Sequence, residues 1–133
     1  MPYQKIILVS GPVIVKNDKI LLDISSDDNF WKFCGGKVKK DESLQNTAIR
    51  RAKEELGINV SITNDTPFLL YTTKEVDNNK NDVILAHFLA DTNDKIIPGE
   101  DVKEWAWIPI EELKNENLAP NIIPTLKHFW FIK

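Results

Sequence analysis

The segment from Ser43 to Leu56 constrains the fold most, because its apolar residues recur at the spacing of one helix face. They stand at steps of four, in the order Leu44, Ala48, Ala52 and Leu56. A helical turn takes about 3.6 residues, so this spacing predicts a face packed against a core. We expect the helix to begin at Asp41 or Glu42, and Gly57 is typical of the residue that ends one.

Runs rich in Ile, Val and Leu lie on both sides of this helix and are expected to be strands. Before it, Lys5–Val15 and Ile20–Ile24 flank a polar turn and favour a hairpin. After it, we expect strands at 58–62, 67–76, 83–90 and 104–108, a helical turn at 110–113 and a final helix at 122–130. The turn signal at Asp77–Asn81 makes the second and third of these strands a hairpin. The sequence therefore predicts an α/β domain with a mixed β-sheet between helices.

Composition narrows the class of partner. Residues 1–133 are expected to form a single domain with a sizeable core, since 42% of them are hydrophobic. The net charge of −3 gives no footprint for a long nucleic acid, although a metal ion could still neutralise the phosphates of a nucleotide. Cys34 is the single cysteine, so a reducing, cytoplasmic setting is expected. No apolar run reaches the roughly 18 residues of a membrane span, and no signal peptide is expected, so the chain should be soluble.

Acidic residues stand at both ends of the predicted helix. Glu54 and Glu55 are adjacent, about 100° apart around the axis, so both carboxylates can lean toward one edge. Glu42 would lie about 120° from Glu54 if the helix begins there, or it is only an acid favoured near a helix start. The glycine loop at Cys34–Gly36 could offer a backbone carbonyl. Such oxygens suit Mg²⁺, which neutralises diphosphate charge and acidifies bound water, whereas on an ordinary surface the glutamates would only be solvated.

These residues share one frame: Gly36, five residues, Glu42, seven residues, Arg50, and then Arg51-Ala52-Lys53-Glu54-Glu55-Leu56-Gly57-Ile58. The frame resembles the Nudix box, G-x5-E-x7-R-E-U-x-E-E-x-G-U, in which U is aliphatic. Two positions depart from it, because Ala52 is a small version of the aliphatic residue and Arg51 stands where the family has a glutamate. The resemblance covers roughly the whole chain and includes the segment Trp107-Ile108-Pro109 and the C-terminal helix.

The resemblance implies a Nudix-like α/β/α sandwich and a metal-dependent hydrolase. In Nudix hydrolases the glutamates that match Glu54 and Glu55 bind Mg²⁺ or Mn²⁺, and the carbonyl that matches Gly35 is often a further ligand. The arginine that matches Arg50 orients one of the glutamates, which fits its spacing of four residues from Glu54. The glutamate that Arg51 replaces commonly binds metal or takes part in activating water.

Arg51 therefore reverses a charge inside the implied metal site. It precedes Glu55 by four residues, so the two are expected to pair on one helix face. Repulsion between this guanidinium, which keeps its proton, and a dication could amount to several kcal/mol, on the order of 4 kcal/mol or more. Two interpretations stay open. Either the site binds nucleotide without hydrolysing it, or Arg51 swings to solvent or clamps a phosphate while an acid from another loop completes the site.

Further candidates come from outside the helix. The replacement acid could be Glu100, Asp101 or Glu104, since family members often draw an acid from this loop. Lys37 contacts phosphates or is a solvated side chain. Asn121, in a segment resembling the base-binding part of some MutT-like proteins, either reads a nucleobase or caps the last helix. Cys34 is expected to be a small buried filler, and His87 and His128 are expected to be packed or half-exposed rather than catalytic. A base could stack on Trp31, Phe33, Trp105, Trp107 or Trp130, but most of these are expected to belong to the core.

Three functions follow as hypotheses. The first is hydrolysis of a nucleoside diphosphate linked to another group, with a nucleoside triphosphate giving monophosphate and pyrophosphate, and with Mg²⁺ or Mn²⁺ held by Gly35, Glu54, Glu55 and either Glu42 or Glu100. The second is a Nudix-fold module that binds a nucleotide or a partner without turnover. The third treats the box as coincidence in an α/β interaction domain. The chain is expected to be a monomer or a homodimer.

Overall fold

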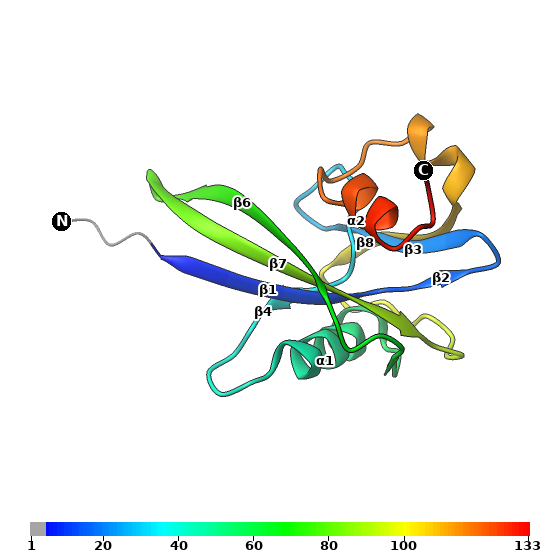
Figure 1. Ribbon diagram of the computed structural model, residues 1–133, viewed down its shortest axis with the longest axis horizontal. Helices are drawn as coiled ribbons and strands as arrows, with labels where there is room; N and C mark the ends of the chain where they lie inside the picture. Colours follow the sequence, from blue (N-terminus) through cyan, green and yellow to red (C-terminus); the bar gives the residue numbers. More distant parts are fainter. Residues whose placement is uncertain (1–4) are drawn as a thin grey trace.

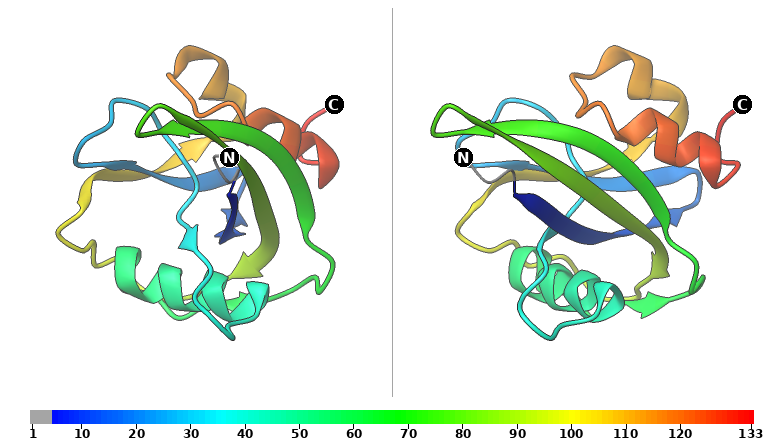
Figure 2. Two further views of the ribbon diagram at one scale, coloured as in Figure 1. Left: turned by 90° about the vertical axis from the view of Figure 1, so that its left-hand side faces the viewer. Right: turned by 60° about the vertical axis from the view of Figure 1, so that its left-hand side comes forward.

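The computed structural model describes residues 5–133, and its longer strands form a mixed sheet. At its centre β1 (Ile6–Val13) runs parallel to β7 (Asn79–Asp91). The short strand β4 (Gly36–Lys37) pairs antiparallel with β1, while β5 (Ser61–Ile62) and β6 (Phe68–Val76) pair antiparallel with β7. Figure 2 shows the long strands β6 and β7 running side by side and curling together. The mixed sheet predicted from the sequence is therefore confirmed.

A second sheet holds β2 (Val15–Lys16), β3 (Lys19–Ser25) and β8 (Val102–Pro109). The predicted N-terminal hairpin is only partly right. Val15 and Lys16 pair with β3, whereas the longer strand before them joins β7 and β4 in the other sheet. The predicted hairpin of β6 and β7 is confirmed, with Asp77 and Asn78 at its turn. Both have positive φ, which Asp and Asn tolerate in tight hairpin turns.

Helix α1 (Leu44–Leu56) lies against one side of the sheet. It begins later than predicted, because Asp41 has a φ of 63°, outside the right-handed helical region, and the Ser43 side chain accepts a hydrogen bond from the Asn46 amide. Its end is as predicted, since Gly57 adopts a φ of 67°, a left-handed conformation that glycine takes without strain. Consequently Glu42 precedes the helix, and the angle of about 120° expected between it and Glu54 does not apply.

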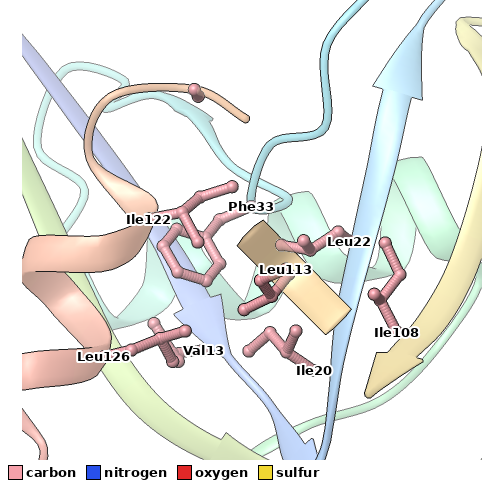
Figure 3. Packing of buried hydrophobic residues seen from close by; sticks show 9 residues of the cluster. Val13, Ile20, Leu22, Phe33, Ile108, Leu113, Ile122 and Leu126 are labelled. Carbon is pink, nitrogen blue, oxygen red and sulfur yellow. The ribbon is translucent and has the colours of Figure 1, made fainter. Parts of the chain in front are cut away.

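The C-terminal part of the chain covers the opposite side. A 3-10 segment, η1 (Ile110–Asn115), leads to α2 (Ile122–His128), and Figure 1 shows α1 and α2 on opposite sides of the strands. The core between β3, β8 and α2 contains Val13, Ile20, Leu22, Phe33, Ile108, Leu113, Ile122 and Leu126 (Figure 3). Within residues 5–133, no helix is long and apolar enough to cross a membrane.

The end of the chain differs from the prediction. The last helix stops at His128 rather than Trp130, because Trp130 has a positive φ. Trp130 is 91% exposed and is therefore not one of the aromatic residues that belong to the core. Trp105 is also exposed, at 38%, whereas Phe33 is buried as expected.

Candidate active site

The last two turns of α1 meet the loop before β4, and Arg51 lies where they meet. Its guanidinium uses three different nitrogens for three different oxygens. Nε donates to the Gly35 carbonyl at 3.3 Å, Nη1 donates to Glu54 Oε2 at 2.8 Å, and Nη2 is hydrogen-bonded to Glu55 Oε1. The pairing with Glu55 confirms the prediction from the spacing of four residues. We call this group of four residues the carboxylate corner.

The carboxylate corner has the ligand chemistry of a hard-cation site. One backbone carbonyl and two carboxylates face a common point, as their contact with a single guanidinium demonstrates. Oxygen donors of this kind suit Mg²⁺ and Mn²⁺. The three residues expected to bind metal, Gly35, Glu54 and Glu55, are thus brought together, and they fit such an ion. The cation that the chain itself places there is Arg51.

Arg51 is held firmly in this position. A Cβ atom on Gly36 would lie 2.4 Å from Arg51 Nε, so the side chain packs directly on the bare backbone of that glycine. Burial opposes the charged form, but the hydrogen bond and the charge of Glu55 outweigh it and raise the pKa of Arg51. The side chain is 28% exposed, so it borders solvent on one side. The guanidinium is charged at every accessible pH.

The neighbouring arginine, Arg50, faces a different set of partners. It binds both oxygens of Glu42, at 2.8 and 3.0 Å, reaches Glu54 at 3.0 Å and donates to the Lys37 carbonyl at 3.0 Å. Hydrogen bonds from Arg50, and then from Thr47, lower the pKa of Glu42 to about 2. Arg50 therefore orients Glu54, as expected from its spacing.

Two predicted residues stand apart from the carboxylate corner. The Glu42 carboxylate accepts hydrogen bonds from Arg50 and from the Lys39 amide, the latter at 3.1 Å. It is not among the three oxygens that contact Arg51. The Lys37 side chain is exposed, and only its carbonyl contacts Arg50. Metal binding by Glu42 and phosphate binding by Lys37 stay predictions.

A partly buried cation, Lys32, contacts Glu55 through the carboxylate oxygen that does not pair with Arg51. Lys32 Nζ is 2.8 Å from Asp23 Oδ1 and 3.3 Å from Glu55 Oε2. Asp23 is fully buried in β3, and burial raises its pKa to about 6 although Lys32 opposes the shift. Burial opposes the Lys32 charge, but Glu55 and Asp23 together raise its pKa. Both oxygens of Glu55 are thus paired, one with Arg51 and one with Lys32.

Sequence reasoning missed the pair of Lys32 and Asp23. The available signal was a break in pattern, since Asp23 interrupts the apolar run from Ile20 to Ile24 and Lys32 stands between two aromatic residues. Ligand-type atoms of Asp23, Cys34 and Glu55 lie within 4.8 Å of one another, and the Lys32 ammonium bridges two of the three. Cys34 is buried, as predicted, and burial raises the pKa of its thiol.

The loop before β8 closes the outer side of the carboxylate corner. A small cavity of about 100 Å³ is lined by Arg51, Glu54, Glu55, Gly99, Glu100, Asp101 and Val102. The Gly99 amide donates to the Glu55 carbonyl at 2.8 Å, which ties this loop to the end of α1. Glu100 and Asp101 therefore border the carboxylate corner through this cavity, whereas Glu104 lies in β8, pairs with Ile24 of β3 and does not line the cavity.

A larger cavity, which we call the apolar cavity, lies on the side of the sheet that faces α2. It measures about 250 Å³ and is lined by Val9, Gly11, Phe30, Lys32, Phe33, Cys34, Gly35, Leu85, Ala86, His87, Ala119 and Asn121. Asn121 is at the start of α2, yet its side chain makes no capping hydrogen bond. Instead, Asn121 Nδ2 is 2.9 Å from His87 Nε2. Base reading by Asn121 stays a prediction, but its side chain does not cap the helix.

Comparison with known proteins agrees with this geometry. The family model of the NUDIX domain matches residues 8–129. The chain belongs to the Nudix family. The solution structure of the ORF135 protein of Escherichia coli superimposes with a TM-score of 0.74 at 29% identity, covering 98% of this chain and 94% of that protein. The Nudix fold inferred from the box is thereby confirmed.

Two curated Nudix relatives are similar at the level of sequence. The nucleoside triphosphatase NudI of E. coli O139:H28 is 25% identical over 128 residues, which cover 87% of this chain and 91% of NudI. The CTP pyrophosphohydrolase of E. coli K12 is 40% identical over 63 residues, which cover 44% of this chain and 47% of that enzyme. The second match therefore spans about half the length of each protein.

Proposed function

We propose that this Nudix protein hydrolyses a nucleoside triphosphate to a monophosphate and pyrophosphate with Mg²⁺ or Mn²⁺. The observation that carries the proposal is the convergence of the Gly35 carbonyl with the carboxylates of Glu54 and Glu55 on one point. This point adjoins the apolar cavity, because Gly35 also lines that cavity. Similarity to a nucleoside triphosphatase and to a CTP pyrophosphohydrolase supports the same substrate class.

Each residue of the carboxylate corner has a role in this reaction. Gly35, Glu54 and Glu55 would hold the metal ion, which supplies phosphate neutralisation and acidification of the attacking water. Arg50 keeps Glu54 oriented through its contact at 3.0 Å. Lys32 does the same for the buried carboxylate of Glu55, at 3.3 Å.

Arg51 has to leave the carboxylate corner before a metal ion can enter it. The side chain is partly exposed and borders the small cavity that contains Glu100 and Asp101. A movement into that cavity would place the guanidinium beside two acids and release both glutamates. From there Arg51 could clamp a phosphate group; if it turned to solvent instead, Glu100 would remain free to replace the acid that the box lacks.

A second function is favoured by the same contacts. Because Arg51 already engages all three oxygens, the carboxylate corner satisfies its charge without any metal ion. The protein would then bind a nucleotide in the apolar cavity and release it unchanged, as a sensing or regulatory module. The cytoplasmic location and the monomeric or dimeric state stay predictions.

Turnover of the four common ribonucleoside triphosphates with Mg²⁺ and with Mn²⁺ tests the proposal. We expect monophosphate and pyrophosphate as products, and a loss of on the order of 100-fold in kcat/KM, about 2.7 kcal/mol, in the Glu55→Gln variant, which keeps size but removes a charged ligand. Glu112→Gln, an exposed position in η1, is the matched control and should keep full activity. No product from any nucleotide with the natural chain, together with turnover by Arg51→Glu, would establish the second function instead.

A further inference from the structure

His87 and Asn121 form a hydrogen-bonded pair at the wall of the apolar cavity. His87 belongs to β7 and is only 4% exposed, and Asn121 starts α2. Strand register pairs His87 with Gly11 and Leu85 with Val9, which places all four on the cavity side of the sheet. The inference below rests on the proposed function, because it concerns how a nucleotide base would be read there.

The contacts of His87 fix which ring nitrogen carries the proton. Its Nδ1 is 3.1 Å from the Phe68 carbonyl oxygen, and a carbonyl can only accept, so Nδ1 is the donor. Burial lowers the pKa of His87, so the ring is neutral near pH 7 and its Nε2 has a free lone pair. His87 Nε2 is therefore an acceptor.

This acceptor in turn fixes the orientation of the Asn121 amide. The group that faces Nε2 at 2.9 Å must donate, so it is the NH₂ end of the carboxamide. If the amide were turned over, two acceptors would face each other and a buried hydrogen bond would be lost. The carboxamide oxygen consequently points away from His87 Nε2 and is the one acceptor that the Asn121 side chain keeps for a ligand.

We propose that His87 is a specificity-determining positioning residue: by holding the Asn121 amide in one orientation, it makes the apolar cavity select a base that offers an amino group to the Asn121 oxygen. The surrounding walls support this selection, because Phe30, Leu85 and Ala119 are apolar and give the base edge no competing partner. Lys32, the charged residue of the lining, is already paired with Asp23 and Glu55.

The location of the cavity fits the base end of a nucleotide. Its volume of about 250 Å³ is slightly below the roughly 300 Å³ at which whole-ligand pockets begin, so it would take the base while the phosphates lie outside. Gly35 lines the cavity and also contributes its carbonyl to the carboxylate corner. A base in the cavity would therefore have its phosphates directed toward Glu54 and Glu55.

Binding of matched pairs of nucleotides tests the proposal. The pairs differ by one amino group: adenine against purine, cytosine against pyrimidin-2-one, and guanine against hypoxanthine, each as the α,β-methylene triphosphate, whose bridge resists cleavage. Dissociation constants are measured calorimetrically with Mg²⁺. For at least one pair we expect the natural chain to bind the amino-bearing base about 10-fold more tightly, the worth of one hydrogen bond.

Variants of His87 separate positioning from general packing. In His87→Phe the ring volume stays but the acceptor is lost, so the preference should fall to about 2-fold or less. His87→Gln can still accept from the amide and should restore the preference. Asn121→Ala, at a partly exposed position, should abolish it and provides the result if the Phe variant does not fold.

The outcomes distinguish this inference from the proposed function. Equal binding of both members of every pair, or an unchanged preference in His87→Phe, would overturn the inference while leaving nucleotide hydrolysis intact. Failure of every nucleotide to bind would overturn both. A preference that disappears in the Phe variant and returns in the Gln variant would establish that His87 fixes the orientation of the Asn121 carboxamide.

Discussion

The carboxylate corner and the apolar cavity are neighbours built in opposite ways. They share Gly35, and Lys32 of the cavity lining contacts Glu55 of the corner, yet the corner is filled by the chain's own guanidinium and the cavity retains a volume of about 250 Å³. In the corner one guanidinium pairs with two carboxylates, whereas in the cavity the Asn121 amide stands among mostly apolar walls. Under the proposed function, a nucleotide base would find room in the cavity, while metal-bound phosphates would compete with Arg51 for the corner.

Lys32 joins the two regions, and removing its charge gives the largest expected effect on stability. In Lys32→Met the fully buried carboxylate of Asp23 loses its cation. We therefore expect the free energy of unfolding, measured by urea titration at pH 7.5, to fall by about 3 kcal/mol. The double variant Asp23→Asn/Lys32→Met removes both charges and should recover much of this loss. If Lys32→Met is as stable as the natural chain, the ion pair of Lys32 and Asp23 does not stabilise the fold between the two regions.

Arg51 occupies the carboxylate corner, whereas the apolar cavity is open, so replacing Arg51 should open the corner to a ligand as well. We expect Arg51→Gln, and more strongly Arg51→Glu, to tighten Mn²⁺ binding, with a gain on the order of 100-fold for the glutamate variant. The reason is that one cation stops competing and two carboxylates are released. Titration calorimetry with Mn²⁺ alone measures the effect, and Lys53→Gln, two residues further along on the exposed face of α1, is the control. Unchanged Mn²⁺ affinity would mean that the Arg51 guanidinium does not compete with the metal ion for the corner.

His87 gives the smallest effect and probes the cavity alone. Its pKa is lowered by burial, so the unfolded chain binds a proton more readily than the folded chain does below about pH 6.5. The contribution of this residue to stability is therefore complete above that pH and is lost as the pH falls through the folded pKa, by at most about 1.4 kcal/mol per pH unit. Urea midpoints at pH 7.5 and 5.0 should differ less in His87→Phe than in the natural chain. An equal difference in both would assign the pH dependence to other groups.

Local patterns carried most of what could be predicted. The helix, its end at Gly57 and the pairing of Arg51 with Glu55 follow from spacing within one element, and the structure confirms them. The start of α1 was misplaced because Asp41 takes a left-handed conformation, which a propensity for helix does not reveal. The catalytic and metal-binding roles of these residues stay predictions.

Contacts between segments that are distant in the sequence could not be predicted from local sequence patterns. β1 pairs with β7, which is more than seventy residues away in the sequence. Parallel strands are not joined by a short turn, so no turn motif in the sequence predicts this pairing. For the same reason Lys32 was missed, since its role depends on Asp23 from β3 and Glu55 from α1 meeting in space. The pairing of His87 with Asn121 likewise brings β7 to the start of α2.

The contact between Gly36 and Arg51 couples what the two positions can tolerate. While the guanidinium lies on the bare backbone of Gly36, a side chain at that glycine collides with it. Once residue 51 is shortened or turned away, the collision disappears and the glycine is released from this constraint. A side chain at residue 36 is therefore expected to destabilise the natural chain more than a variant in which residue 51 is shortened.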